Sequence, residues 1–233
     1  MNRLGERLLD LLYPPKCAFC RRLVAGGRML CPDCEKQLPA TEKEMQSRKI
    51  SGLAVCLSPL YYTGDVRQSL HRYKFQGAAA YYRIYAELMA DCMREHGLTA
   101  DLVTWVPLSR KRLRRRGYDQ ARLLAEEVAR LQGLPCERTL EKIRNNPAQS
   151  GTAGIAERQK NVRGVYRAVT SFSGEHVLLV DDIVTTGATL SEAAKELLNA
   201  GAERVSGLTL ARTEREDRGF TTESNGESDY ADI

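Results

Sequence analysis

Two adjacent carboxylates, Asp181 and Asp182, directly follow four apolar residues, Val177 to Val180. Backbone N–H groups at the start of a helix favour a phosphate, and threonine hydroxyls add donors. Carboxylates repel phosphate, so the two acids must hold another part of the same ligand, such as ribose hydroxyls or a metal ion that bridges them. The spacing predicts a sugar-phosphate site. Its loop consists of Thr185, Thr186, Gly187, Ala188 and Thr189.

The predicted elements around this loop suit such a site. The apolar run before the acids predicts a buried parallel strand. An ordinary strand–turn–helix capped by threonine or aspartate is the alternative, but capping requires neither two adjacent acids nor a glycine at these positions. The helix after the loop is predicted from apolar residues at helical spacing, which are Leu190, Ala193, Ala194, Leu197 and Leu198.

This segment resembles the loop that binds phosphoribosyl diphosphate (PRPP) in type I phosphoribosyltransferases. The shared pattern is an apolar strand, Asp181-Asp182, two residues, and then Thr185 to Thr189. The resemblance implies that the loop holds the 5′-phosphate and that the two catalytic acids hold the ribose hydroxyls. It also implies that Mg²⁺ bridges ribose and pyrophosphate. We expect both carboxylates to project into the site from the strand end.

A second anion-binding segment is predicted after the apolar run Leu102 to Val106. A tight turn at Pro107 would present backbone N–H groups, Ser109 and Arg110 to an anion. The segment resembles the loop of amidophosphoribosyltransferases that cradles the pyrophosphate of PRPP. An ordinary turn with solvated cations is the alternative.

A third segment, from Lys142 to Arg163, is polar and basic and has no clear core stripe before Val162. It is similar to the hood of phosphoribosyltransferases, which folds over the bound ligand. By that resemblance, Arg158, Lys160 and Arg163 would reach pyrophosphate oxygens when the hood closes. The alternative for each is an ordinary surface cation.

A basic run, Arg110 to Arg116, has six cations in seven positions. Such a run is usually a solvated face, but this density exceeds what pyrophosphate needs. We interpret it as a site for a polyanion, namely single-stranded DNA, contacted by Arg112, Arg114 and Arg115. The aromatic residues that would offer stacking faces, if the fold brings them near, are Tyr73, Phe75 and Tyr118.

Four of the seven cysteines form two pairs, Cys17-x-x-Cys20 and Cys31-x-x-Cys34. Two such turns can place four thiolates around zinc, and this ligand set leaves no open position for substrate, so the predicted site is structural. The alternatives are two disulfides, which the cytosol disfavours, a redox pair, which does not need two copies, and an iron–sulfur cluster. The short module lacks a core, so metal binding would supply its folding free energy, whereas the remaining chain has a core of its own.

The chain of 233 residues has room for one medium domain with a small appendage. We expect a zinc-ribbon module over 1–40, a polar linker over 41–52, a phosphoribosyltransferase-like domain over 53–211 and a disordered polar tail over 212–233. The tail holds seven acids and three arginines, whereas the whole chain has a net charge of +5. The part before the tail is therefore strongly basic, which suits phosphate-rich partners.

Strands and helices alternate along the main domain. Predicted strands at 54–62, 102–106, 161–169 and 205–210 alternate with predicted helices at 80–96 and 117–131. Such alternation predicts an α/β fold with a parallel sheet flanked by helices, which is also the type I phosphoribosyltransferase-like fold that the resemblance implies. Ligands in such sheets bind at the carboxyl ends of the strands, where the acids and Pro107 are predicted to lie.

The complete set of motifs resembles the ComF family of competence proteins. The resemblance implies a cytoplasmic protein of natural transformation, associated with incoming single-stranded DNA and with a helicase-like ATPase partner. In order, the motifs are the two cysteine pairs, Leu70 to Phe75, Arg116 to Gln120, Arg163 to Tyr166, and the predicted PRPP loop.

Two further functions stay open from the sequence. One is a metabolic phosphoribosyltransferase whose acceptor no segment identifies, and the other is a PRPP-sensing regulator. No apolar run approaches the roughly 18 residues of a membrane-spanning helix. The charged N-terminus indicates a short amphipathic helix rather than a signal peptide, so we expect a cytoplasmic location.

Overall fold

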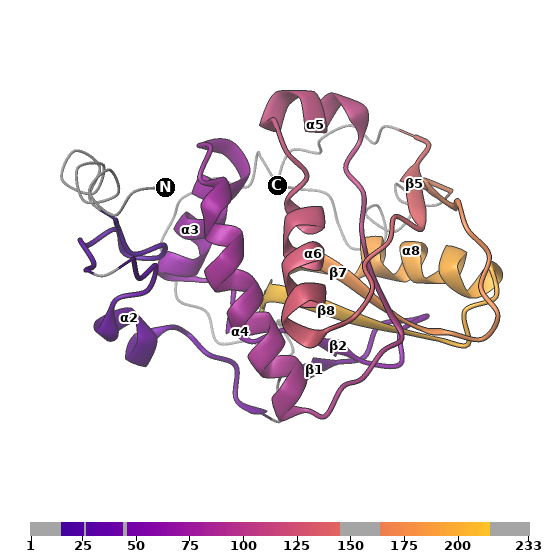
Figure 1. Cartoon of the computed structure of the whole chain (residues 1–233), viewed down its shortest axis with the longest axis horizontal. Helices are drawn as coiled ribbons and strands as arrows, with labels where there is room; N and C mark the ends of the chain where they lie inside the picture. The colour runs from indigo at the N-terminus through magenta and orange to yellow at the C-terminus, as the bar shows by residue number, and fades with distance from the viewer. Residues whose placement is uncertain (1–14, 26, 44–45, 145–163, 215–233) are drawn as a thin grey trace, which may run out of the picture.

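A computed structural model describes residues 15–25, 27–43, 46–144 and 164–214 (Figure 1). Within these residues the main sheet is six-stranded, in the order β1-β2-β8-β7-β4, and β3 also pairs with β8. β1 is antiparallel to β2, and the other pairs are parallel, which confirms the predicted α/β class. The strands are β1 (Ser47–Arg48), β2 (Cys56–Leu57), β3 (Leu60–Tyr61), β4 (Leu102–Trp105), β7 (His176–Val184) and β8 (Arg204–Arg212).

Helices cover both faces of this sheet. In Figure 1, α4 and α6 cross in front of β7 and β8. The side chains of α8 pack in a second cluster, against residues of β7 that alternate with those facing α4 and α6. The helices are α2 (Pro32–Gln37), α3 (Gly64–Phe75), α4 (Tyr82–Glu95), α5 (Arg110–Arg116), α6 (Gln120–Gln132) and α8 (Ala188–Asn199), with a short 3₁₀ turn, η2 (Ala79–Tyr81).

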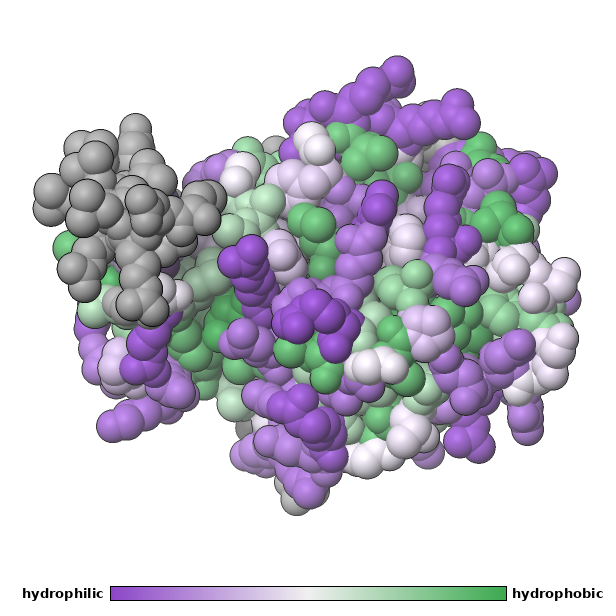
Figure 2. Space-filling model, viewed as in Figure 1, coloured by the Kyte–Doolittle hydropathy of each residue, from purple (hydrophilic) through white to green (hydrophobic). Residues whose placement is uncertain are grey.

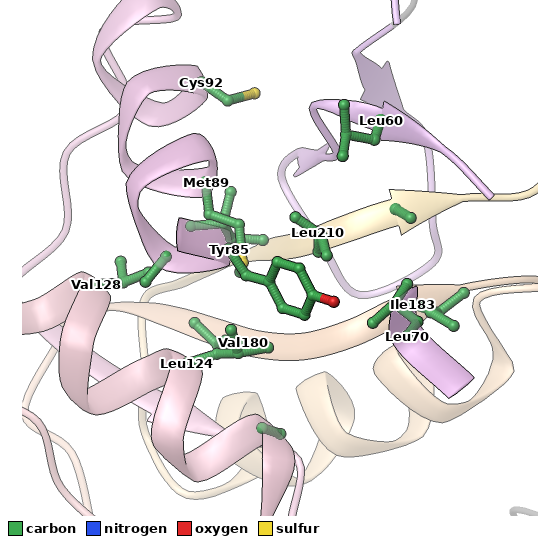
Figure 3. Close-up of a cluster of buried hydrophobic side chains, with 14 of the residues drawn as sticks. Leu60, Leu70, Tyr85, Met89, Cys92, Leu124, Val128, Val180, Ile183 and Leu210 are labelled. Atoms are coloured by element: carbon green, nitrogen blue, oxygen red, sulfur yellow. The ribbon is translucent and has the colours of Figure 1, made fainter. Parts of the chain in front are cut away.

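The central strand β7 explains why the chain before the acids is apolar without interruption. Leu178 and Val180 pack with α4 and α6, whereas Val177 and Leu179 pack with α8. A strand buried on both faces has no polar side, so the two-residue alternation of a half-exposed strand is lost. Figure 3 shows the first of these two cores, where side chains of α4 and α6 meet on the sheet; among them are Tyr85, Met89, Leu124 and Val128.

Two predicted elements are divided. The helix predicted over 117–131 begins only at Gln120, because Gly117 has a φ of 80° and ends α5, while Asp119 caps α6. The strand predicted over 54–62 splits into β2 and β3 around Pro59, which has no N–H to donate.

A short strand predicted over 161–169 corresponds to β6 (Tyr166–Ala168) in the described residues. The sequence did not predict α3, nor β5 (Leu140–Lys142), which forms a separate antiparallel pair with β6. The pair flanks the predicted hood, whose residues 145–163 lie outside the described residues.

The segment predicted as a linker, 41–52, contributes β1 to the main sheet. The zinc-ribbon segment is also tied to the body nearby, since Tyr61 N donates to Pro39 O at 2.8 Å. Of the predicted tail, only residues 212–214 belong to the described residues. None of the helices in the described ranges is long and apolar enough to cross a bilayer.

Candidate functional site

The four cysteines of the two pairs lie together in a group fit for a metal. Their Sγ atoms all lie within 4.8 Å of one another, and Cys20 Sγ is 3.6 Å from Cys31 Sγ. Tetrahedral zinc with Zn–S bonds of about 2.3 Å would separate its sulfurs by about 3.8 Å, so the spacing fits. Cys31 also precedes α2 as its N-cap and accepts a hydrogen bond from Cys34 N at 3.4 Å.

Backbone groups favour the thiolate form at one of these cysteines. Burial opposes ionisation of Cys17, but hydrogen bonds from the backbone of Cys20, Cys31 and Phe19 lower the pKa of its thiol to about 7. Burial raises the pKa of Cys34 instead. A bound zinc ion would offset that burial penalty, because the thiolate is the form that binds the metal.

The first cysteine turn is docked on α3. Arg72 donates to Ala18 O at 2.9 Å and to Phe19 O at 2.6 Å, and Ser69 donates to Ala18 O at 2.5 Å. The Phe19 ring lies 5.7 Å from that of Tyr85 on α4. The cysteine turn therefore belongs to the same core as the main domain, contrary to the expected separation of the two cores.

The two acids of β7 have different hydrogen-bond and ion-pair partners. Asp182 lies on the α3 side, where Lys74 Nζ is 3.1 Å from its Oδ1 and both residues are only 8% exposed. Asp181 is half-buried, and its Oδ1 accepts a hydrogen bond from Asp182 N at 2.8 Å. Successive side chains of a strand alternate in direction, and the expectation that both acids face the ligand stays a prediction.

Asp181 also lies near charged and aromatic residues of the β5–β6 pair. The negative charge of Asp181 raises the pKa values of Lys142 and Tyr166 on the β5–β6 pair, whereas the positive charge of Arg112 lowers them. Burial, and then the neighbouring Asp182, raise the pKa of Asp181. Burial lowers the pKa of Lys142 to about 8, and its Nζ lies 5.4 Å from the Tyr166 ring centre.

The predicted PRPP loop is supported by residues of the segment that we expected to be a linker. Arg48 donates to Thr185 O at 2.5 Å. Gly187 has a φ of 81°, and a Cβ there would lie 2.9 Å from Ile50 Cδ1, so no other residue fits without strain. Thr186 Oγ1 accepts from Ala188 N at 3.3 Å where α8 begins. The last of the loop residues, Thr189, lies in the first turn of α8.

The predicted pyrophosphate loop lies beside β7. Val106 N donates to Val180 O at 3.0 Å, which fixes the loop at the carboxyl end of the sheet. Leu108 N donates to Asp119 Oδ2 at 3.2 Å. Ser109 is buried and caps α5 by accepting from Arg112 N at 3.3 Å, while Arg110 is exposed.

The arginines of α5 point in different directions. Arg116 and Arg115 lie over the Phe75 ring, with 4.7 Å and 5.7 Å between the guanidinium carbon and the ring centre. Arg114 is exposed, whereas Arg112 is half-buried on the Asp181 side. Figure 2 shows hydrophilic side chains gathered over the top of the molecule, where Figure 1 shows α5.

Of the three candidate stacking residues, Phe75 is the one whose ring lies under these arginines. Tyr73 is fully buried, and its hydroxyl donates to Gln120 O at 2.9 Å. The Tyr118 hydroxyl donates to Tyr73 O. Tyr73 and Tyr118 therefore join α3 to the start of α6.

Comparisons with known proteins cover most of this chain. A family model described as a phosphoribosyl transferase domain matches residues 115–224, and one described as a double zinc ribbon domain matches residues 8–45. The DNA utilization protein YhgH of Salmonella typhimurium is 31% identical over 207 residues, which cover 84% of this chain and 90% of that protein. Competence protein F of Haemophilus influenzae is 30% identical over 207 residues, with 85% of each chain covered. Competence protein ComFC of Bacillus subtilis is 28% identical over 204 residues, with 84% and 78% covered.

The chain belongs to the ComF family. This membership confirms the predicted phosphoribosyltransferase-like domain and the predicted zinc ribbon.

Several residues of this ComF-family protein were missed by reasoning from the sequence. Lys74 and Asp119 belong to motifs that carried the family resemblance, but no role followed from their types. Arg48 and Ile50 lie in a polar stretch with no motif. The predicted hood residues Arg158, Lys160 and Arg163 lie outside the described residues.

Proposed function

We propose that this protein binds PRPP with Mg²⁺ and also binds single-stranded DNA, and that it acts in DNA uptake during natural transformation. The observation that carries the proposal is the meeting of Asp181, the 185–189 loop and the 106–109 loop at the carboxyl ends of β7 and β4. Parallel α/β sheets bind their ligands at this edge. The names of the relatives, competence proteins and DNA utilization proteins, support the biological role.

Each part of PRPP has a matching group in this arrangement. The 5′-phosphate would bind to the 185–189 loop at the start of α8, where the helix dipole favours an anion. Asp181 would accept hydrogen bonds from the ribose hydroxyls, and Arg110 and Arg112 would lie near the pyrophosphate. Mg²⁺, held by ribose and pyrophosphate oxygens near Asp181, would neutralise part of the ligand's charge.

The PRPP site is tested with Asp181→Asn. We expect this change to weaken PRPP binding roughly ten-fold or more, because hydrogen bonds to a charged group contribute about 1.5–3 kcal/mol and 1.4 kcal/mol is ten-fold in affinity. Calorimetry with PRPP and Mg²⁺ measures the effect. Asp65→Asn, at an exposed acid in the first turn of α3, is the matched control. Equal PRPP affinity in Asp181→Asn and in the unmodified protein would contradict the assignment.

The same PRPP samples decide whether the protein turns the ligand over. If pyrophosphate is released in the presence of an acceptor panel, a metabolic phosphoribosyltransferase becomes the better description. Binding without release supports the DNA-uptake proposal. The helicase-like ATPase partner stays a prediction.

The DNA site is tested with the double variant Arg114→Ala/Arg115→Ala. Each cation that neutralises a phosphate contributes about 0.7 to the salt slope on single strands, so the slope should fall by up to about 1.4 units and affinity should fall with it. Arg112 is left intact because its charge acts beside Asp181. Fluorescence anisotropy with a labelled oligonucleotide at several salt concentrations measures both quantities.

The matched control for the DNA experiment is Arg94→Ala/Arg130→Ala, which removes two exposed arginines from α4 and α6. This control should keep DNA affinity, and both double variants should keep PRPP affinity. If the α5 variant bound DNA with unchanged affinity and salt slope, the arginines would be ordinary solvated cations.

A further inference from the structure

The segment Arg48 to Ile50 lies against the loop that joins β7 to α8. Arg48 Nη1 donates to Thr185 O at 2.5 Å, although the two residues are 137 positions apart. Ile50 occupies the space beside Gly187 that a Cβ would need. Arg48 is itself fixed, because β1 pairs with β2 in the main sheet and Arg48 stands opposite Cys56.

The Arg48 contact determines the direction of one peptide unit in the loop. The described residues contain no cis peptide bond, so the Thr185–Thr186 peptide is trans. In a trans peptide the C=O and the following N–H point in opposite directions. Because the Thr185 carbonyl points to Arg48, the Thr186 N–H points away from Arg48.

We propose that Arg48 is a positioning residue of the phosphate loop, holding the Thr185 carbonyl so that the Thr186 N–H is directed at the 5′-phosphate of the ligand. The inference rests on the proposed function, since it assigns a role within the PRPP site. Its physical basis is preorganisation: a donor that is already aimed at an anion needs no rearrangement on binding. A carbonyl turned toward the phosphate would instead repel it.

A purely structural role for Arg48 makes a different prediction from a positioning role. If Arg48 only anchored β1, its loss would weaken every ligand of the site through general loosening of the fold. If Arg48 orients one peptide of the 185–189 loop, its loss weakens only ligands that carry the 5′-phosphate. Pyrophosphate alone is expected at the 106–109 loop, which Asp119 and β7 hold through separate hydrogen bonds.

The experiment measures ribose 5-phosphate and pyrophosphate binding separately by calorimetry, in the full-length protein and three variants. Arg48→Ala should weaken ribose 5-phosphate roughly ten-fold, the effect of losing about 1.4 kcal/mol, and leave pyrophosphate affinity within two-fold, about 0.4 kcal/mol. Arg48→Lys should recover part of the loss, since an ammonium can also donate to the carbonyl. Lys49→Ala removes the adjacent exposed cation and should change neither affinity.

Thermal unfolding of each variant accompanies the titrations, so that loss of fold is recognised. Unchanged ribose 5-phosphate affinity in Arg48→Ala, or an equal loss for both ligands, would overturn the inference. If the unmodified protein binds pyrophosphate and PRPP but Arg48→Ala leaves ribose 5-phosphate unaffected, only the role of Arg48 is wrong. If the unmodified protein binds none of these ligands, the proposed function fails and the role of Arg48 fails with it.

Discussion

Cys31→Ser is expected to release zinc and to lower the midpoint of thermal unfolding for the whole chain. Structural zinc contributes about 10–16 kcal/mol to the folding of zinc-finger peptides, and a serine at one of four ligands removes much of that contribution. The effect should extend beyond the ribbon, because Phe19 packs on Tyr85, and Arg72 and Ser69 bind the backbone of the cysteine turn. Once that turn loosens, the Arg72 guanidinium loses the carbonyl acceptors to which it donates hydrogen bonds.

Elemental analysis and calorimetry of the purified protein test this expectation. The unmodified chain should contain one zinc per molecule, and Cys31→Ser should contain little. Cys136→Ser is the matched control, since Cys136 is half-buried and lies outside the metal group. A zinc-free unmodified protein with both cysteine pairs oxidised, or a Cys31→Ser protein that unfolds at the same temperature, would contradict the argument.

Lys74→Met should also destabilise the chain, by a smaller amount and without any change to the zinc site. Lys74 and Asp182 form a buried ion pair, and removing one partner of such a pair costs about 3–5 kcal/mol because it leaves a buried charge without compensation. Urea denaturation should therefore show a lower free energy of unfolding for Lys74→Met, and also for Asp182→Asn, which leaves the lysine unpaired.

The double variant Lys74→Met/Asp182→Asn completes a double-mutant cycle with the two single variants. With both charges removed, it should be more stable than either single variant, which is the signature of direct coupling. The exposed pair Arg122–Glu126 on α6 provides the comparison, since Arg122→Ala there should cost under about 1 kcal/mol. Additive effects of the two single substitutions would show that Lys74 and Asp182 do not interact in solution.

The parts of the site that could be predicted are local in the chain. The strand, the acids and the 185–189 loop occupy one continuous segment, so residue types and spacing were enough to predict the strand and the helix on either side of the loop. The four cysteines likewise indicate their ligand geometry through two short spacings. The parallel sheet followed from the alternation of apolar strands and helical stripes.

The parts that could not be predicted depend on contacts between distant segments. Lys74 reaches Asp182, and Arg48 reaches Thr185, and no periodicity in the sequence links either pair. The α5 helix has no apolar stripe, because six of its seven residues are cations, so its helical spacing was invisible. For that reason the sequence predicts one group of Arg112, Arg114 and Arg115, although the helix turns them to different sides.

Helix α3 contacts both the cysteine turn of the zinc ribbon and Asp182 of the candidate ligand site. Ser69 and Arg72 hold that turn, and Lys74, only two residues further along the same helix, holds Asp182 beside the predicted ligand loop. Loss of zinc is therefore expected to disturb the Lys74–Asp182 ion pair without any substitution in the proposed PRPP site. If the proposed function holds, a cell starved of zinc would lose sugar-phosphate binding together with the metal, so zinc supply would regulate the proposed site through α3.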